Sequence, residues 1–389
     1  MAGALGYGRA INTLKTELGK RQKARITDLP REVLALILCH LTLAHDIAKV
    51  APTSRGLRDA VRHAFVARPF SRAVSTFHRG GSSGNCVLSV AVASDGRVFI
   101  GSDNFINVYG LRSLRVKAHA DGVTGVAALP DGRFVSVSFD RTVKMWKQDG
   151  SLENNIEASL EPASPKAYSL AVLPDGLHFV VGAAFGSTLD AHVEGEVRLY
   201  HTNGTLVRTF KSHHRPVRAL AVTSDGQHII SGSDDRFVKV WNVARTRCER
   251  SYAGHTECVA AVAAMPDNVR ILSGGADGIR VWRLDRPKAR IGIPDGPCSF
   301  HLKSVSAMAL VAMPDNQHAL FGSSDGRVAL FNVDAGIVLR TFSQHEHGNY
   351  DVGSHCCVTC LALLPDGLRF VSASYEGPAC IAYHGLAPQ

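Results

Sequence analysis

Histidine, serine and aspartate recur together three times along the chain, each time followed by a tryptophan. The three sets are His119, Ser136, Asp140 and Trp146; His213, Ser231, Asp235 and Trp241; and His255, Ser273, Asp277 and Trp282. Serine, histidine and aspartate could form a nucleophilic triad, in which histidine removes the proton of the serine hydroxyl. An enzyme needs one such site, whereas three copies in register indicate a repeated structural unit. We therefore expect no catalytic residue among them.

The segment around the second set shows which elements must position these side chains. Its apolar residues alternate with polar ones, and a Ser224-Asp225-Gly226 turn separates the first two runs, as in an antiparallel hairpin. The pattern predicts four consecutive strands, at residues 217–222, 227–231, 237–241 and 248–252. One four-stranded sheet cannot bury both of its faces, so it needs neighbours of the same kind.

The same turn recurs seven times, at intervals of 36 to 51 residues. The tripeptides begin at Ser94, Pro130, Pro174, Ser224, Pro266, Pro314 and Pro365. With these turns and the repeated tetrads, residues 73–384 resemble the WD-repeat family. The resemblance implies a mainly β fold, a seven-bladed β-propeller with four strands in each blade. In that family the tetrad is a hydrogen-bond chain from the inter-blade loop to the indole of the tryptophan.

Four blades depart from the tetrad pattern. Aromatic residues other than tryptophan take the tryptophan position of blades one, three, six and seven, namely Tyr109, Tyr200, Phe331 and Tyr383. We expect these blades to depend on packing more than on the polar chain.

The seventh unit lacks an outer strand before the sequence ends. Three blades close with similar tripeptides, Arg208-Thr209-Phe210, Arg250-Ser251-Tyr252 and Arg340-Thr341-Phe342, and Ser75-Thr76-Phe77 repeats this pattern before the first blade. We predict that residues 73–77 pair with residues 381–383 and close the ring, which removes two open sheet edges.

Residues 26–66 have a different character from the repeats and predict three short helices. Leu34, Ile37, Leu38 and Leu41 fall on one helical face, and so small a module has more apolar positions than it can bury. The Leu-Pro start and the leucine spacing resemble the F-box, which docks on the Skp adaptor of cullin-RING ubiquitin ligases. The resemblance implies six apolar anchors for that adaptor, Leu29, Pro30, Leu34, Ile37, Leu41 and Val50. Residues 51–53 depart from the family pattern, and the alternative is an amphipathic helical cap without an adaptor.

Charge is unevenly distributed between the two parts of the chain. Residues 1–79 hold 14 Lys and Arg against 5 Asp and Glu, a surplus of nine, whereas residues 80–389 hold 29 of each. We expect residues 1–25 to form a flexible basic tail and the neutral propeller, residues 67–389, to bind nucleic acid poorly. Irregularly placed cysteines, with neither a secretory signal nor a membrane-spanning run, indicate an intracellular protein of the cytoplasm or nucleus.

Ligand chemistry has few candidates in the repeats. F-box receptors with WD repeats that bind phosphorylated peptides carry arginines near the start of the inner strands and before the turn aspartate. Only Arg218 matches, and Arg141, Arg215 and Arg236 are near turns, so these four residues form a candidate target-binding face. The longest insertions, residues 183–194 and 344–357, should emerge on that same face by the family topology.

Metal and cofactor chemistry is not favoured. Cys357 and Cys360 form a Cys-x-x-Cys pair near His355 and Cys356, but strand alternation points the two cysteines to opposite faces and no second pair exists. We interpret them as buried or half-buried thiols. No glycine-rich phosphate loop precedes a helix, so the sequence predicts no cofactor.

The sequence as a whole favours a non-catalytic adaptor. The helical module would bind a Skp-type adaptor and its cullin complex, and the propeller would hold a target protein near the ligase. The alternative is a structural WD-repeat scaffold for complex assembly without a ligase role. A third reading, an RNA- or ribosome-associated protein, has only the basic N-terminal segment in its favour.

Overall fold

The computed structural model describes eleven stretches of the chain: residues 75–78, 86–110, 113–157, 166–185, 194–245, 247–285, 300–302, 306–343, 345, 357–375 and 379–384. The chain divides into two compact units, Met1–Ala73 and Val74–Gln389. All described residues belong to the second unit. The expected basic tail and helical module, residues 1–25 and 26–66, lie outside them.

Seven four-stranded antiparallel sheets make up the described part of the second unit. The first four blades are β2 (Val87–Val92), β3 (Val98–Ser102), β4 (Phe105–Tyr109) and β5 (Leu114–Lys117); β6 (Val123–Ala128), β7 (Phe134–Ser138), β8 (Thr142–Trp146) and β9 (Leu152–Glu157); β10 (Lys166–Val172), β11 (His178–Phe185), β12 (Glu194–His201) and β13 (Leu206–His213); and β14 (Val217–Val222), β15 (His228–Ser233), β16 (Phe237–Asn242) and β17 (Cys248–Ala253).

The other three blades follow the same order, except that the last takes one strand from the other end of the unit. They are β18 (Val259–Ala264), β19 (Arg270–Gly275), β20 (Gly278–Arg283) and β21 (Phe300–Leu302); β22 (Ala307–Ala312), β23 (His318–Ser323), β24 (Val328–Asn332) and β25 (Ile337–Phe342); and β26 (Val358–Leu363), β27 (Arg369–Ser374), β28 (Ala379–Tyr383) and β1 (Ser75–His78).

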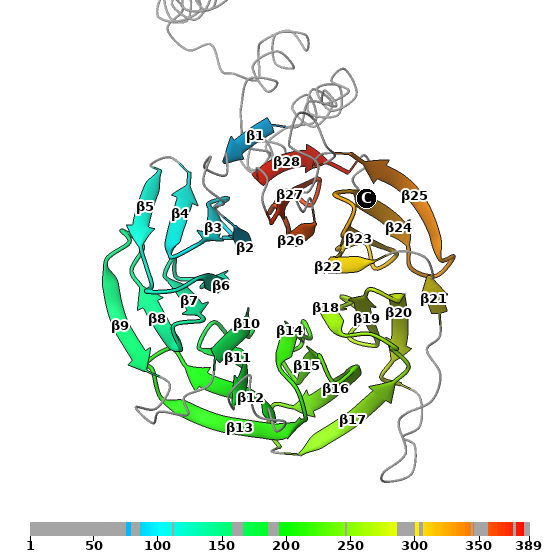
Figure 1. The fold of residues 1–389 in the computed structure, drawn as a ribbon, viewed down its shortest axis with the longest axis horizontal. Helices are drawn as coiled ribbons and strands as arrows, with labels where there is room; N and C mark the ends of the chain where they lie inside the picture. Colours follow the sequence, from blue (N-terminus) through cyan, green and yellow to red (C-terminus); the bar gives the residue numbers. More distant parts are fainter. Residues whose placement is uncertain are drawn as a thin grey trace, which may run out of the picture. The chain divides into compact units, whose positions relative to one another are not determined.

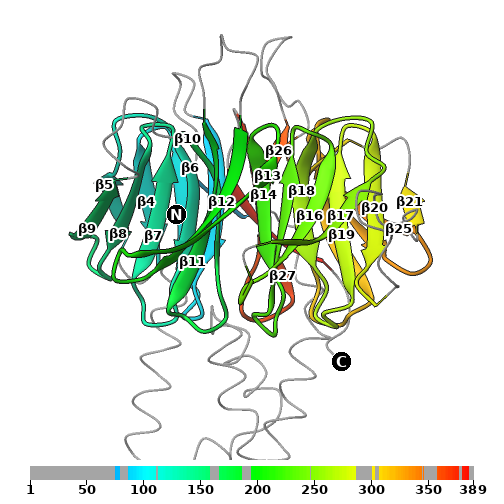
Figure 2. The same ribbon diagram turned by 90° about the horizontal axis from the view of Figure 1, so that it is seen from below.

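The sheets stand around a common centre as a seven-bladed β-propeller (Figure 1). The first strand of each blade, such as β2 or β14, lies nearest the centre, and the last, such as β5 or β17, lies at the rim (Figure 1). Seen from the side, the blades stand next to one another with their strands running between the two faces of the disc (Figure 2).

Strand β1 completes the seventh blade. It runs antiparallel to β28, with Ser75 opposite Ile381 and Thr76 opposite Cys380, and the two strands lie side by side in Figure 1. Because β28 would otherwise present unpaired backbone groups at a sheet edge, this pairing joins the two ends of the unit in one sheet.

The apolar core lies between neighbouring blades rather than within one. Seven clusters of buried residues each draw on two adjacent sheets, and together they account for every junction of the ring. The cluster between blades two and three, for example, contains Val137 and Met145 from one blade and Phe179 and Tyr200 from the next. A blade therefore stabilises its neighbours, as expected for repeats that cannot bury their faces alone.

The tripeptides that end the outer strands fasten one blade to the next. The aromatic ring of Phe210 lies 5.6 Å from that of Trp241, and Tyr252 lies 5.1 Å from Trp282, in each case across a blade junction. In the same motif, the guanidinium of Arg208 donates a hydrogen bond to the carbonyl of Val243 in the following blade. The repeated motif thus has a packing role between blades.

The turns between the first two strands of each blade form a second recurring network. The carboxylate of Asp267 accepts hydrogen bonds from the backbone N–H groups of Val269 (2.8 Å) and Arg270 (2.9 Å) and from Nε of Arg270 (2.6 Å). A basic side chain pairs with the turn aspartate in five other blades, through Arg97, Arg133, His178, His318 and Arg369. These contacts of the aspartate therefore hold the backbone of the turn in one conformation.

Two of these turns have asparagine where the others have glycine. Asn268 and Asn316 have φ values of 57° and 62°, in the left-handed region that asparagine tolerates. Their side chains compensate for the strain, because Oδ1 of Asn316 accepts a hydrogen bond from the backbone N–H of Asp267 in the preceding blade, at 2.9 Å. Oδ1 of Asn268 accepts one from the hydroxyl of Ser224 in the same way.

Candidate functional site

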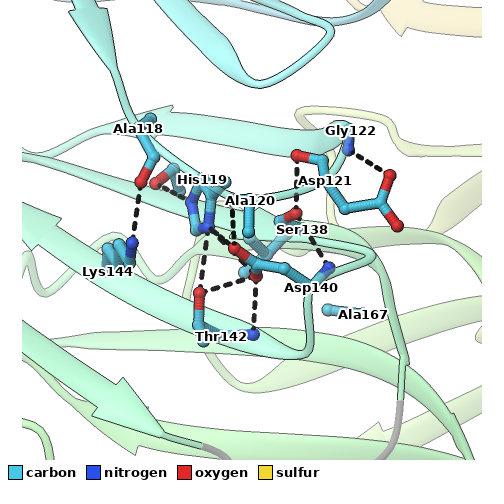
Figure 3. Close-up of polar contacts among 12 residues, drawn as sticks. Ala118, His119, Ala120, Asp121, Gly122, Ser138, Asp140, Thr142, Lys144 and Ala167 are labelled. Carbon is cyan, nitrogen blue, oxygen red and sulfur yellow. Dashed lines mark hydrogen bonds and ion pairs between the residues drawn. The ribbon is translucent and has the colours of Figure 1, made fainter.

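The first tetrad forms a continuous hydrogen-bond chain in blade two. The indole of Trp146 donates to Oγ of Ser136 at 2.8 Å, and Ser136 Oγ lies 2.7 Å from Nε2 of His119. Nδ1 of His119 lies 2.9 Å from the carboxylate of Asp140, which also accepts from the backbone N–H of Thr142 (Figure 3). The chain thus links the inter-blade loop that carries His119 to strands β7 and β8.

The other two tetrads repeat this geometry in blades four and five. His213 lies 2.7 Å from both Ser231 and Asp235, and His255 lies 2.7 Å from Ser273 and 2.6 Å from Asp277. The indoles of Trp241 and Trp282 donate to the serines at 2.8 and 2.7 Å.

Burial settles what the three tetrads can do chemically. The three serines have no solvent-exposed surface, and the imidazole side chains of the three histidines are fully covered. A substrate therefore cannot reach the serine Oγ atoms, and each hydroxyl is already engaged with an imidazole and an indole. The arrangement satisfies buried polar groups, whose loss would cost about 1 to 3 kcal/mol each.

The aspartates anchor the loops through charge-assisted hydrogen bonds. Burial would raise the pKa of Asp277, but hydrogen bonds from His255 and from the backbone N–H of Thr256 lower it to about 2. For Asp140, hydrogen bonds from His119 and Thr142 likewise outweigh burial and hold the pKa well below its usual range. These carboxylates are therefore ionised at neutral pH.

A buried or half-buried cation that the sequence did not point to accompanies each tetrad. In blade two, Nζ of Lys144 donates to the carbonyl of Ala118 at 2.8 Å (Figure 3). Arg280 lies 3.1 Å from the carboxylate of Asp277 in blade five. In blade four the counterpart is Lys239, whose pKa is lowered by burial. All three residues directly face the tetrad serine on the neighbouring strand, which is the signal that could have identified them.

Blade seven contains half of a tetrad. Nε2 of His345 lies 2.9 Å from Oγ of Ser372, and both residues are buried. The tryptophan position of this blade is Ala382, because Ala382 faces Phe370 as Trp241 faces Ile229. Our assignment of Tyr383 to that position was wrong by one residue: Tyr383 faces Arg369 instead.

The half tetrad predicts a loss of stability at mildly acidic pH. Burial lowers the pKa of His345 to about 4, below the value of about 6.5 for an unfolded chain. The unfolded state then binds the proton first, so stability is fully present above pH 6.5 and falls as the pH approaches 4, by up to about 3 kcal/mol. We expect His345→Gln to flatten the pH dependence of the urea midpoint between pH 7 and 4.5. Equal slopes for the two proteins would contradict the assignment.

The four arginines of the candidate target-binding face have different surroundings. Arg218 pairs with the carboxylate of Asp234, with Nε and Nη2 at 2.9 Å from one oxygen, and its guanidinium covers the ring of Tyr168 at 4.7 Å. Burial alone would lower the pKa of Arg218, but the hydrogen bond to Asp234 and the charge of that carboxylate raise the pKa above its usual value. Arg141, Arg215 and Arg236 are exposed, the first in blade two and the others in blade four. The four thus come from two blades, and the guanidinium of Arg218 is already held by a carboxylate.

In two other blades, the second residue of the inner strand, which is the position of Arg218 in β14, is a threonine that forms a hydrogen bond with the next inner strand. The hydroxyl of Thr124 donates to the carbonyl of Ala167 in the next blade at 2.9 Å, and that of Thr359 donates to the carbonyl of Val87 at 2.7 Å. These threonines thus support the ring.

The insertion at residues 183–194 is partly strand rather than loop. Ala183, Ala184 and Phe185 extend β11 and face Glu196, Gly195 and Glu194 of β12. The hairpin of blade three is therefore longer than its counterparts.

Other predicted sites fall partly or wholly outside the described residues. Among the described side chains, no group of three or more His, Cys, Asp and Glu could hold a metal ion. Burial raises the pKa of Cys360 to about 12, which leaves the thiol protonated; His355 and Cys356 are not described.

The six adaptor anchors, Leu29, Pro30, Leu34, Ile37, Leu41 and Val50, also lie outside the described part. Within that part, no helix is long and apolar enough to span a bilayer.

Comparison with known proteins agrees with the propeller. The family model of the WD domain, G-beta repeat, matches residues 111–147, 204–242 and 246–283. Each matched segment contains one complete tetrad, so the chain contains WD repeats in blades two, four and five. The first three strands of each of the other blades, which lack the tryptophan, lie outside these matches.

Several curated proteins are similar to the chain at low identity. They include Telomerase protein component 1 of Mus musculus (26% identical, 73% of this chain), the Ubiquitin fusion degradation protein 3 homolog of Caenorhabditis elegans (25%, 60%) and the U3 small nucleolar RNA-associated protein 15 homolog of Xenopus tropicalis (24%, 50%). The matches cover only 10%, 26% and 36% of those three proteins. The chain thus matches only a part of each of these proteins.

Proposed function

We propose that this chain, a propeller with WD repeats, recruits a target protein to a Skp/cullin/F-box type ubiquitin ligase and supplies no catalytic group itself. The observation that carries the proposal is the combination of two parts. A closed ring suited to protein–protein interaction follows residues 26–66, a segment that resembles the F-box and whose sequence predicts more apolar positions than so small a module can bury. Such a protein accelerates ubiquitin transfer by holding the target close to the ligase.

Two further observations support this proposal. The tetrad serines, which are the strongest candidates for nucleophiles, are inaccessible and committed to the fold. One relative, to which 60% of this chain is similar, is named as a homologue of a ubiquitin fusion degradation protein.

The second candidate function is a structural scaffold for complex assembly without a ligase role. The names of the relatives favour it, because a telomerase component and a protein associated with a small nucleolar RNA have similar repeats. A role in RNA-protein particles would use the basic segment of residues 1–79 rather than the neutral propeller.

Binding to a purified Skp-type adaptor separates the first two functions. The intact chain should bind it, and Leu34→Asp should weaken binding by about 30-fold or more, because a charge replaces a central apolar anchor. The measurement is isothermal titration calorimetry with the purified adaptor. Leu152→Asp is the matched control, since Leu152 is an exposed leucine of β9 (48% exposed) and its replacement should leave adaptor binding unchanged.

Failure of the intact chain to bind the adaptor would favour the scaffold. A salt titration of RNA binding, with and without residues 1–25, tests the third reading. Strong binding that depends on those residues and weakens steeply with salt would support it.

A further inference from the structure

A row of apolar and aromatic side chains crosses blades one to three, where the inner strands begin. Leu88 is the second residue of β2, Phe139 follows β7, and Tyr168 lies near the start of β10. We call these three residues the aromatic shelf. Each is partly exposed to solvent.

Phe139 contacts Tyr168 directly, whereas Phe139 and Leu88 are neighbours across Gly122. The rings of Phe139 and Tyr168 meet edge to face, with centroids 5.4 Å apart. A methyl group built on Gly122 would lie 3.5 Å from Leu88 and 3.6 Å from Phe139, so the glycine leaves a gap with an apolar wall on each side. An aromatic or large aliphatic side chain of a partner could bury apolar area here.

Charge is distributed asymmetrically around the aromatic shelf. Nζ of Lys166 lies 5.9 Å from the ring centre of Phe139, and no carboxylate of the described residues forms an ion pair with it. Exposed Arg215 and Arg236 of blade four also lack an ion pair within the described part of the chain. The exposed carboxylate of Asp121 lies at the opposite end, next to Gly122. The end of the shelf near blade four is therefore the one that attracts anions.

Arg218 limits which anion suits this surface. Its guanidinium is held by both oxygens of Asp234, at 2.9 and 3.0 Å, while one face covers Tyr168. A phosphate would have to displace that carboxylate to gain a bidentate arginine contact. The remaining cations come from different segments, with Lys166 half-buried and Arg215 and Arg236 exposed, which suits several single carboxylates better than one doubly charged group.

We propose that the aromatic shelf binds a short acidic segment of a target protein, without a requirement for phosphorylation. An aromatic or large aliphatic side chain of the segment packs on Phe139 and Tyr168, and its Asp and Glu residues extend toward Lys166, Arg215 and Arg236. The proposal rests on the target-binding role of the propeller, but not on adaptor binding.

Selection from a phage-displayed library of random linear peptides tests the proposal on the intact chain. Enriched peptides should combine Asp or Glu with a neighbouring Phe, Tyr, Trp or Leu. One enriched peptide, synthesised with a fluorescent label, then gives dissociation constants by fluorescence anisotropy. Phe139→Ala and Tyr168→Ala should each weaken its binding by about tenfold or more.

Two controls keep the result interpretable. Leu206→Ala removes an equally apolar and exposed side chain (50% exposed) from the rim strand β13 and should not change peptide binding. Lys166→Glu leaves the aromatic rings in place and should weaken binding while the thermal midpoint stays unchanged, which separates recognition from folding. Binding to the intact chain should also fall as salt is raised.

Three results would overturn the proposal: enrichment of basic or uncharged peptides, binding that survives both aromatic substitutions, or tight binding only after phosphorylation of the peptide. Adaptor binding is measured on the same protein preparation. If the chain binds the adaptor but no acidic peptide, the proposal for the aromatic shelf is wrong and the ligase role is not affected. If the chain binds the peptide but not the adaptor, the ligase role is wrong and the proposal for the shelf is not affected.

Discussion

A chain that begins at residue 84 should be far less stable than one that begins at residue 68, because only the longer chain contains β1. The loss should be on the order of 5 kcal/mol, since the strand contributes backbone hydrogen bonds along the edge of β28 and covers its buried residues. The measurement is the thermal midpoint of each purified chain, with light scattering to detect aggregation.

The physical reason is the open edge that truncation leaves. Ala379 and Cys380 of β28 are buried, and β1 pairs directly with both of them. Without β1, the shorter chain exposes an unpaired edge that can pair with another molecule, so aggregation should accompany the lower midpoint.

A synthetic peptide of residues 70–80 provides the control. Added in excess to the shorter chain, it should raise the midpoint, because it can occupy the vacant edge of β28. Equal stability of the two truncated chains would show that β1 is dispensable for ring closure.

Much of the fold follows from a few local signals. Repeated turns, alternating apolar runs and the Ser-Thr-Phe tripeptide near Ser75 sufficed to predict a mainly β, seven-bladed propeller. The reason is physical: each blade is defined by local hairpins, and only the closure depends on distant residues.

The errors arise where a repeat loses its landmarks. Tyr383 was placed one residue off because no tryptophan marks the third strand of blade seven, and a shift of one residue moves a side chain to the other face of the strand. The link between His345 and Ser372 was missed because 27 residues separate them, against 17 or 18 in the complete tetrads.

The candidate site was harder to predict than the fold. The sequence presents Arg218 as a surface cation, but the inner strand β14 and the turn after β15 meet at one end of the sheet, which brings Asp234 against it. Likewise, the contact between Phe139 and Tyr168 joins two blades, and no local pattern reports such a contact. The sequence locates the strand ends well, but it does not show which side chains meet there.

Asp235→Ala should destabilise the propeller by about 3 kcal/mol, since it leaves three hydrogen-bond donors, among them the imidazole of buried His213, without an acceptor. The carboxylate accepts hydrogen bonds from Nδ1 of His213 at 2.7 Å, from the backbone N–H of Phe237 at 3.0 Å and from that of His214 at 3.1 Å. Alanine removes all three acceptor contacts at once, and it also frees the loop that joins blades three and four. The free energy of unfolding in urea measures the effect.

The chain supplies a matched control in blade six. Asp325 follows Phe321 by four residues, as Asp235 follows Ser231, and Phe321 and Ser231 hold the same register position in their sheets. Asp325 is exposed, with half of its side-chain surface free, and no histidine is hydrogen-bonded to it in the described part of the chain. It accepts a backbone hydrogen bond from Arg327 at 3.1 Å. Asp325→Ala should therefore cost less than about 1 kcal/mol.

The difference between the two substitutions isolates the contribution of the tetrad from that of an aspartate in a turn. Both variants remove one carboxylate from the same position of a blade, so the change in net charge and in turn propensity is shared. The Trp241 indole should report the loss as well, because its donor contact to Ser231 depends on the imidazole that Asp235 orients. A red-shifted tryptophan emission is expected in Asp235→Ala and not in Asp325→Ala. If both variants unfold at the same urea concentration, the polar chain adds nothing to the blade, and packing alone must account for its stability.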